Sequence, residues 1–210
     1  MAALPDEVME HHGAVHGLIN NAGIIQPFVH LKDLECDVVQ RVLDVNLMGT
    51  IYMVKSFVPH LLQQAEAHIA NVSSMGGLLP VPGQTVYGAA KAAVKLMTEG
   101  LYAELLDTNV GVSVVMPGAV ATNITHNSGV ETPGGAAAVE DPPFQPTSAE
   151  DAARIILDGI EKKTLHVLVG KDAKAMFAAS RIAPKRATHF IQKQMKSLLD
   201  TSPSDIGRAR

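Results

Sequence analysis

The chain has 210 residues, of which 47% are apolar, with few aromatic side chains, no tryptophan and a formal net charge of −4. This composition is typical of one globular domain with a substantial core, and it excludes disordered and coiled-coil proteins. The single cysteine, Cys36, excludes an intramolecular disulfide and fits a reducing compartment, so we expect a cytoplasmic protein. The sequence has no apolar run of membrane-spanning length and no secretory signal at its acidic N-terminus.

The first half of the chain alternates between helical and strand patterns. A short helix is predicted over 3–12, a strand over 14–20 and a long helix over 31–62. The apolar stripe of this long helix changes phase near Asn46, which predicts a break or kink there. A second strand is predicted over 67–74.

The same alternation continues in the second half of the chain. The predicted elements are, in order, a helix over 85–106, a valine-rich strand over 111–118, a long loop over 119–146, a helix from the capping box Thr147–Glu150 to Lys163, a strand over 165–170 and a helical remainder. Strands separated by helices indicate parallel pairing, and therefore a doubly wound α/β sheet. Ligands bind such sheets at the carboxyl ends of the strands. Small or polar residues follow the first three strands, at Asn21–Gly23, Ser73–Ser74 and Pro117–Gly118.

Charge is distributed unevenly along the chain. Residues 1–170 contain 8 Lys or Arg and 18 Asp or Glu, whereas residues 171–210 contain 9 and 3. The basic end could bind an anionic partner, or it could be a solvated helix face followed by a frayed tail, which is the commoner case. Only Phe177 and Phe190 lie among the basic residues, so nucleic acid binding is not expected.

The sequence resembles the short-chain dehydrogenase/reductase family in five motifs, which follow the family's order and spacing between about residues 13 and 170. These motifs are NNAG (20–23), the Asn46 of VLDVNLMG, NVSS (71–74), YGAAK (87–91) and PGAVAT (117–122). The resemblance implies a Rossmann-like catalytic domain over 1–170, followed by a helical extension over 171–210. It also implies an oxidoreductase that uses NAD or NADP to interconvert a secondary alcohol and a ketone.

Tyr87 and Lys91 carry the central chemistry. Four residues apart on a helix, they lie about 6 Å from each other on one face. A neighbouring ammonium favours the phenolate, so we expect the pKa of Tyr87 to fall below its usual value of about 10. Tyr87 could then act as a general acid or base. The family implies that Lys91 also holds the nicotinamide ribose, and we expect Lys95, one turn later, to be solvated.

Ser74 and Asn46 complete the predicted catalytic set. Ser74 lies thirteen residues before Tyr87, as in the family, and would hydrogen-bond the substrate oxygen. Ser73 is interpreted as a strand-end serine bonded to backbone. Asn46 matches the family asparagine that holds a water connecting Lys91 to solvent. The alternative for Asn46 is a helical asparagine that bonds its own backbone, which would also explain the kink.

The resemblance also assigns cofactor contacts beyond Tyr87 and Lys91. Asn21, Ala22 and Gly23 would lie against the adenosine half of the dinucleotide, where Gly23 permits close approach because it has no Cβ. The segment that contains Pro117 and Gly118 would meet the nicotinamide amide, with Val120 contributing its backbone and Thr122 its hydroxyl. No metal site is predicted, because His11 and His12 have no further ligands at suitable spacing.

Partners are less closely specified by the sequence. Leu78, Leu79 and Val81, close to Ser74, suggest an apolar-rimmed pocket for a small alcohol or ketone. A homodimer or homotetramer is expected through the helices at 46–62 and 85–106. The second helix presents small faces through Ala89, Ala90, Ala92 and Ala93, and family members pair through these helices.

The chain departs from the family at its N-terminal side, because no glycine-rich phosphate-binding turn precedes Asn21. We therefore expect a Rossmann-like sheet that is incomplete on this side, with Met1 an internal methionine of a longer reading frame. The strand at 14–20 would then be an exposed edge, and the chain alone would be poorly soluble and bind dinucleotides weakly. The alternative function is a non-catalytic remnant that serves only as an assembly or binding module.

Overall fold

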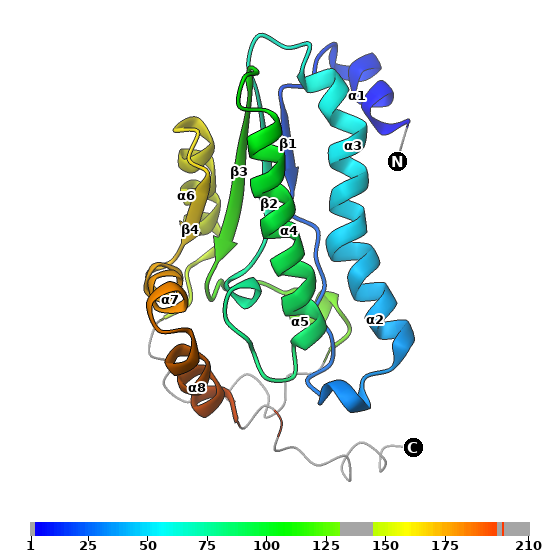
Figure 1. Cartoon of the computed structure of the whole chain (residues 1–210). Helices are drawn as coiled ribbons and strands as arrows, with labels where there is room; N and C mark the ends of the chain where they lie inside the picture. Colours follow the sequence, from blue (N-terminus) through cyan, green and yellow to red (C-terminus); the bar gives the residue numbers. More distant parts are fainter. Residues whose placement is uncertain (1–2, 131–144, 197–198, 200–210) are drawn as a thin grey trace.

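The computed structural model of the chain describes residues 3–130, 145–196 and 199. Four parallel strands form one sheet, and their order in space follows their order in the chain (Figure 1). They are β1 (Gly17–Asn20), β2 (Ala67–Val72), β3 (Val110–Pro117) and β4 (His166–Val169). A helical connection follows each of the first three strands, so the predicted parallel α/β sheet is confirmed.

Helices cover the sheet on both faces. The pair α3 (Gly49–Leu61) and α4 (Thr85–Glu104) covers one face, where Val54 and Phe57 of α3 pack against Ile69 and Val112 of the strands. The opposite face of β3 and β4 carries α6 (Ala149–Glu161), which packs against Val115. Val112 and Val115 point to opposite faces because successive side chains alternate along a strand. The valine-rich strand is therefore buried on both sides, as the doubly wound prediction requires.

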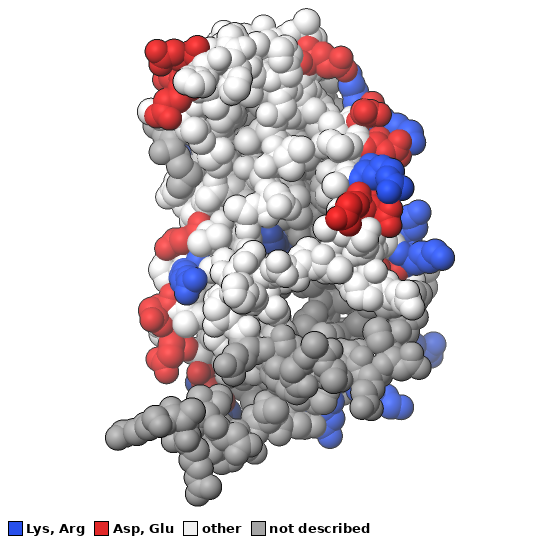
Figure 2. Space-filling model, turned by 180° about the vertical axis from the view of Figure 1, so that it is seen from behind, with Lys and Arg blue, Asp and Glu red and all other residues white. Residues whose placement is uncertain are grey.

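The strand β1 is the edge of the described sheet. It pairs with β2, and Ile19 in its middle is 49% exposed. Seen from behind, acidic and basic side chains gather toward the sides of the molecule, and its centre is uncharged apart from a small basic patch (Figure 2). The expected edge position of the first strand is therefore confirmed for the described residues.

The remaining helices lie at the two ends of the sheet. Near the start of β1, α1 (Leu4–His12) packs on α3. The helices α7 (Lys171–Ile182) and α8 (Pro184–Met195) follow β4 and lie beyond the carboxyl ends of the strands (Figure 1). Their apolar faces join the core, where Ala187 and Ile191 pack with Leu79. Within the described ranges, no helix is both long and apolar enough to cross a membrane.

Several predicted boundaries were wrong by a few residues. The helix predicted from residue 31 begins as α2 (Cys36–Leu43), after a separate 3-10 turn, η1 (Leu31–Asp33). The predicted break at Asn46 is confirmed, as a π-helical turn, η2 (Asp44–Met48), between α2 and α3. The first strand begins at Gly17 rather than at residue 14.

Two further differences lie in the second half of the chain. The capping box was placed one residue early, because Ser148 is the N-cap of α6 and its Oγ accepts a hydrogen bond from the Asp151 amide at 3.0 Å. The predicted loop over 119–146 contains a short helix, α5 (Ile124–Asn127), and its residues 131–144 lie outside the described part of the chain.

Candidate active site

The helix α4 begins at the carboxyl edge of the sheet and carries Tyr87 and Lys91 on successive turns. The Lys91 Nζ lies 6.0 Å from the centroid of the Tyr87 ring. Lys91 is only 3% exposed, and its ammonium donates a hydrogen bond to the Val72 carbonyl at 2.9 Å, where β2 ends. The predicted pair is therefore buried at the carboxyl edge of the sheet and is not a surface tyrosine beside a solvated lysine.

A residue far away in the sequence holds the start of α4. The side-chain oxygen of Gln26 accepts hydrogen bonds from the Val86 and Tyr87 amides at 2.9 and 3.0 Å. Helix N-termini leave such amides without intrahelical partners, and a local cap usually satisfies them. Gln84 at the N-cap makes no cap bond and instead donates from Nε2 to the Gln26 carbonyl at 2.6 Å. Gln26 therefore anchors the backbone that carries Tyr87.

The expected fall in the Tyr87 pKa is not found in the protein alone. Burial raises the pKa of Tyr87, and the neighbouring Ser74 hydroxyl only partly opposes this shift. Burial also lowers the pKa of Lys91 from 10.5 to about 8. The prediction considered the charge of Lys91 but not the desolvation of both groups, which disfavours phenolate and ammonium alike.

Ser74 is brought to Tyr87 by close packing between the turn η3 (Met75–Gly77) and α4. The Ser74 Oγ accepts a hydrogen bond from the Gly76 amide at 3.0 Å and caps this turn. A Cβ added at Gly77 would lie 2.8 Å from the Ala92 nitrogen of α4. A Cβ at Gly88 would lie 2.9 Å from the Gly76 oxygen. Glycines on both sides therefore allow the two backbones to meet, which places Ser74 beside α4.

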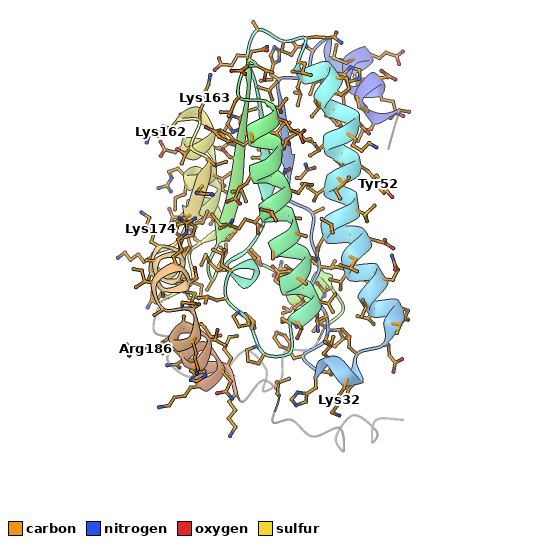
Figure 3. The ribbon with its side chains drawn as sticks, in the orientation of Figure 1. Lys32, Tyr52, Lys162, Lys163, Lys174 and Arg186 are labelled. Atoms are coloured by element: carbon orange, nitrogen blue, oxygen red, sulfur yellow. The ribbon has the colours of Figure 1, made fainter. Side chains whose placement is uncertain are left out.

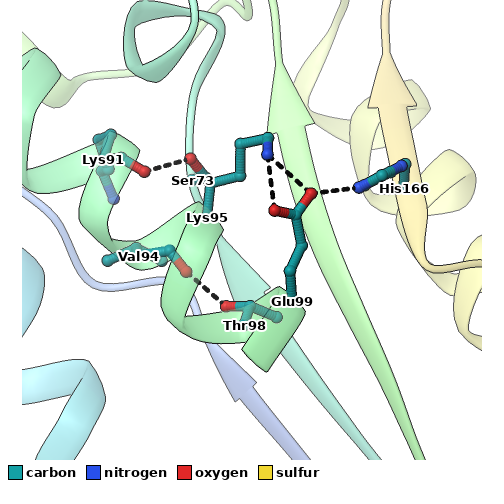
Figure 4. Close-up of polar contacts among 7 residues, drawn as sticks. All are labelled: Ser73, Lys91, Val94, Lys95, Thr98, Glu99 and His166. Carbon is teal, nitrogen blue, oxygen red and sulfur yellow. Dashed lines mark hydrogen bonds and ion pairs between the residues drawn. The ribbon is translucent and has the colours of Figure 1, made fainter. Parts of the chain in front are cut away.

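Ser73 and Lys95 make structural contacts close to Lys91. The Ser73 Oγ donates to the Lys91 carbonyl at 2.7 Å, which confirms its predicted bond to backbone (Figure 4). The expectation that Lys95 is solvated was wrong. Its ammonium is half-buried and pairs with Glu99 at 2.7 Å, and Glu99 also meets the His166 Nε2 at 2.6 Å (Figure 4).

Asn46 is fully buried within the π-helical turn and points at the segment after β1. Its Oδ1 accepts from the Ile24 amide and its Nδ2 donates to the Ile24 carbonyl, both at 2.8 Å. The alternative in which Asn46 bonds its own helix backbone is therefore wrong. A Cβ at Gly23 would lie 3.1 Å from the Asn46 Oδ1 and 3.2 Å from the Lys91 Nζ. Gly23, Asn46 and Lys91 thus meet in one place.

The other predicted cofactor contacts also lie at the carboxyl edge. Asn21 and Ala22 are exposed directly after β1. Pro117 and Gly118 end β3, beside the cavity described below. Val120 pairs with Thr147 in an isolated parallel bridge. Its two hydrogen bonds run from the Ala121 amide to the Thr147 carbonyl and from the Thr147 amide to the Ala119 carbonyl, so this pairing does not use the amide or carbonyl of Val120. Thr122 is exposed and does not line the cavity, so the structure does not bring it to the other site residues.

A cavity of about 300 Å³ opens beside Ser74 and Tyr87. Its apolar walls are formed by Ile25, Phe28, Met75, Leu79, Val81, Met176, Ile191 and Met195. Leu79 and Val81 line it as predicted, whereas Leu78 packs with Met75 and Met116 in the core instead. Sequence analysis missed the contribution of α7 and α8, and it missed Gln84 and Asp172. Asp172 lies three residues after the end of β4, so extending the strand-end rule to that strand would have pointed to this segment.

The chain is similar to known proteins of one family. A sequence profile of the short chain dehydrogenase family matches residues 1–132. SadH of Mycobacterium tuberculosis is 37% identical over 182 residues, which make up 84% of this chain and 66% of SadH. Dehydrogenase/reductase SDR family member 7B of Mus musculus is 30% identical over 169 residues, or 80% of this chain and 52% of that protein.

Solved structures of the family superpose on most of the fold. A short-chain dehydrogenase/reductase from Burkholderia phymatum in complex with NAD has a TM-score of 0.73 and 30% identity, and the match covers 88% of this chain and 70% of that one. A short chain dehydrogenase from Burkholderia cenocepacia in complex with NADP has a TM-score of 0.72 and 26% identity, with 90% and 75% covered. The chain belongs to the short-chain dehydrogenase/reductase family, and it spans 52–66% of the length of the two curated relatives described above.

Proposed function

We propose that this protein is an NAD(P)-dependent oxidoreductase that interconverts a secondary alcohol and a ketone by hydride transfer. The observation that carries the proposal is the meeting of Tyr87 and Ser74 at one apolar cavity, with the ammonium of Lys91 buried behind the tyrosine. The structural neighbours that bind NAD or NADP support the choice of cofactor.

Tyr87 and Ser74 act on the substrate oxygen. In the reducing direction the Tyr87 hydroxyl donates its proton to the carbonyl oxygen, and the Ser74 hydroxyl donates a hydrogen bond to the same atom as negative charge develops there. In the oxidising direction Tyr87 accepts the proton from the alcohol. The bound dinucleotide supplies or accepts the hydride.

Lys91 and Asn46 replenish the proton on Tyr87. A pKa of about 8 means that the Lys91 ammonium loses and regains a proton close to neutral pH, so it can exchange protons on each turnover. Asn46 lies beside the lysine, and each of its polar atoms can make one more hydrogen bond beyond those to Ile24. It could therefore hold a water between Lys91 and solvent.

The residues at the carboxyl edge fit a dinucleotide. Gly23 leaves open the space that a Cβ would fill beside Asn46 and Lys91, and the Lys91 ammonium has donors beyond the one used by Val72. Asn21 and Ala22 would extend this surface along the adenosine half. Pro117, Gly118 and the Val120 backbone, whose amide and carbonyl are not used in the pairing with Thr147, would face the nicotinamide. The Thr122 hydroxyl, which does not line the cavity, would reach the nicotinamide only after its segment moves. NAD and NADP both fit this proposal.

The assembly and setting of the enzyme belong to the same proposal. We expect a homodimer or homotetramer that pairs through α3 and α4, because both helices expose large apolar side chains, Tyr52 at 45% and Leu96 at 70%. We also propose a catalytic domain over 1–170 with an extension over 171–210. A cytoplasmic location is consistent with the lone Cys36.

The test is an assay of NADH and NADPH oxidation with a panel of apolar ketones, together with calorimetric titration of both cofactors. The proposal expects ketone-dependent oxidation of at least one cofactor, with Tyr87 required. Binding of a cofactor without any ketone-dependent turnover would contradict the proposal and would favour the non-catalytic assembly module, whereas weak cofactor binding alone is the behaviour expected of this chain.

A further inference from the structure

Asp172 is a buried carboxylate in the wall of the substrate cavity. It lies in the first turn of α7, directly after β4, and only 6% of the residue is exposed. Its Oδ2 accepts a hydrogen bond from the Ala119 amide at 2.6 Å. A Cβ at Gly118 or at Gly170 would overlap with the carboxylate, so both glycines leave room for it. The site is therefore built around Asp172.

The second oxygen of this carboxylate has a different status. Among the described residues, nothing donates a hydrogen bond to the Asp172 Oδ1, and no Lys, Arg or His pairs with the side chain. The start of α7 is a favourable place for negative charge, and the cavity wall around the carboxylate is mainly apolar. Buried carboxylates are stable when hydrogen-bond donors surround them, so one acceptor position is open for a ligand.

We propose that Asp172 is a specificity-determining residue that accepts a hydrogen bond from a second polar group of the substrate. The substrate class is an apolar ketone or secondary alcohol that also carries a hydroxyl or amino group. A substrate with a carboxylate in its place is rejected, because two negative charges would share an apolar cavity. This inference rests on the proposed function, because it deepens the specificity of the same cavity.

The simpler role for Asp172 is to hold the Ala119 amide. The variant must therefore separate this structural role from the proposed hydrogen bond to the substrate. Asp172→Asn keeps the size of the side chain and an oxygen that can accept from Ala119, but it removes the charge. The matched control is Asp151→Asn, the same change in the first turn of α6, where the carboxylate is exposed. Melting temperatures of both variants report any structural loss.

The measurement compares three medium-chain methyl ketones of equal length that end in a methyl, a hydroxyl or a carboxylate group. When two ketones are measured with the same enzyme preparation, the ratio of their kcat/KM values does not depend on what fraction of the protein is active. Wild type should prefer the hydroxyl ketone over the methyl ketone by at least about tenfold, as expected for a hydrogen bond to a charged group. Asp172→Asn should reduce this ratio severalfold and relieve the rejection of the carboxylate ketone, whereas Asp151→Asn should change neither.

The same ketones give a readout that does not require catalysis. Ligand-observed saturation-transfer NMR on the cofactor-free chain should rank them hydroxyl, methyl, carboxylate, and Asp172→Asn should flatten that order. This ranking without turnover of any ketone would sink the proposed function and leave the role of Asp172 standing. Ratios within twofold of wild type in Asp172→Asn, or binding of none of the three ketones, would overturn the inference.

Discussion

Lys91 places an ammonium group where water barely reaches it. The residue is 3% exposed, its described hydrogen bond goes to the Val72 carbonyl, and burial lowers its pKa to about 8. A buried cation with one hydrogen bond costs stability, and such costs are typical of active sites. The same burial gives the lysine a pKa suited to proton exchange near neutral pH.

The stability cost of Lys91 should depend on pH. Between pH 8 and 10.5 the unfolded chain holds the lysine proton and the folded chain does not, so the contribution of Lys91 to stability rises with pH through this window. The total change is about 3 kcal/mol. The test is urea unfolding of wild type and Lys91→Met at both ends of the window. From the lower to the higher pH, the unfolding free energy of wild type relative to the variant should rise by about that amount.

The control for this experiment is Lys95→Met, one turn along the same helix, where the ammonium pairs with Glu99. An equal shift in both variants would show that the effect does not come from the burial of Lys91.

The adjacent serines should separate stability from activity. Ser73→Ala removes the 2.7 Å hydrogen bond to the Lys91 carbonyl, which keeps its helical partner, so we expect a loss of about 0.5–1.5 kcal/mol in unfolding free energy with most of kcat retained. Ser74→Ala should lower kcat by about 10²-fold or more and change stability less. Denaturant unfolding and steady-state kinetics on both variants measure this, and equal losses of kcat would contradict the assignment of Ser74.

At the scale of elements, the contact between η3 and α4 sets the distance from Ser74 to Tyr87. Gly77→Ala would put a methyl group 2.8 Å from the Ala92 nitrogen, so the turn and the helix must move apart. We expect a loss of stability of about 1–3 kcal/mol, since overpacking of this kind forces backbone shifts. We also expect a fall in kcat, because the hydroxyls of Ser74 and Tyr87, which we propose to be catalytic, would separate.

The matched change is Gly100→Ala near the end of the same helix, where an added Cβ meets nothing within 4 Å. It should stabilise the protein by about 0.5–1 kcal/mol, because glycine is a poor helix former. Thermal unfolding compares the two variants. A Gly77→Ala protein as stable and active as wild type would contradict the account of this contact.

Local patterns in the sequence were enough to predict the elements and part of the site. The helical spacing of Tyr87 and Lys91, each strand-end segment and the phase change at Asn46 are local patterns, since each depends on residues only a few positions apart. The Gln26 cap and the Asp172 contact could not be predicted, since they join segments 60 and 53 residues apart. The Tyr87 pKa was wrongly predicted because burial depends on the whole fold.

At the scale of the whole molecule, the exposed apolar residues of α3 and α4 predict an assembly. Tyr52 lies at the outer edge of α3 (Figure 3), and Leu96 on α4 is 70% exposed. We expect multi-angle light scattering to report a dimer or tetramer at micromolar concentration. The double variant Tyr52→Glu, Leu96→Glu should shift it toward the monomer, because charge in an apolar interface is costly.

The control for the assembly is Phe190→Glu on α8, where the side chain is 50% exposed but lies away from α3 and α4. Its mass should match wild type. A wild-type monomer, or dissociation caused by Phe190→Glu alone, would contradict pairing through α3 and α4.

The most direct test of the catalytic assignment is Tyr87→Phe, which removes one hydroxyl and keeps the ring. Turnover of ketone and alcohol substrates should fall by about 10²-fold or more, because general acid–base groups contribute at least that much. Thermal stability and the affinity for NAD(H) or NADP(H), measured by calorimetric titration, should stay close to wild type. A variant that retains more than about a tenth of wild-type kcat would contradict the account, because Tyr87 would then not transfer the proton.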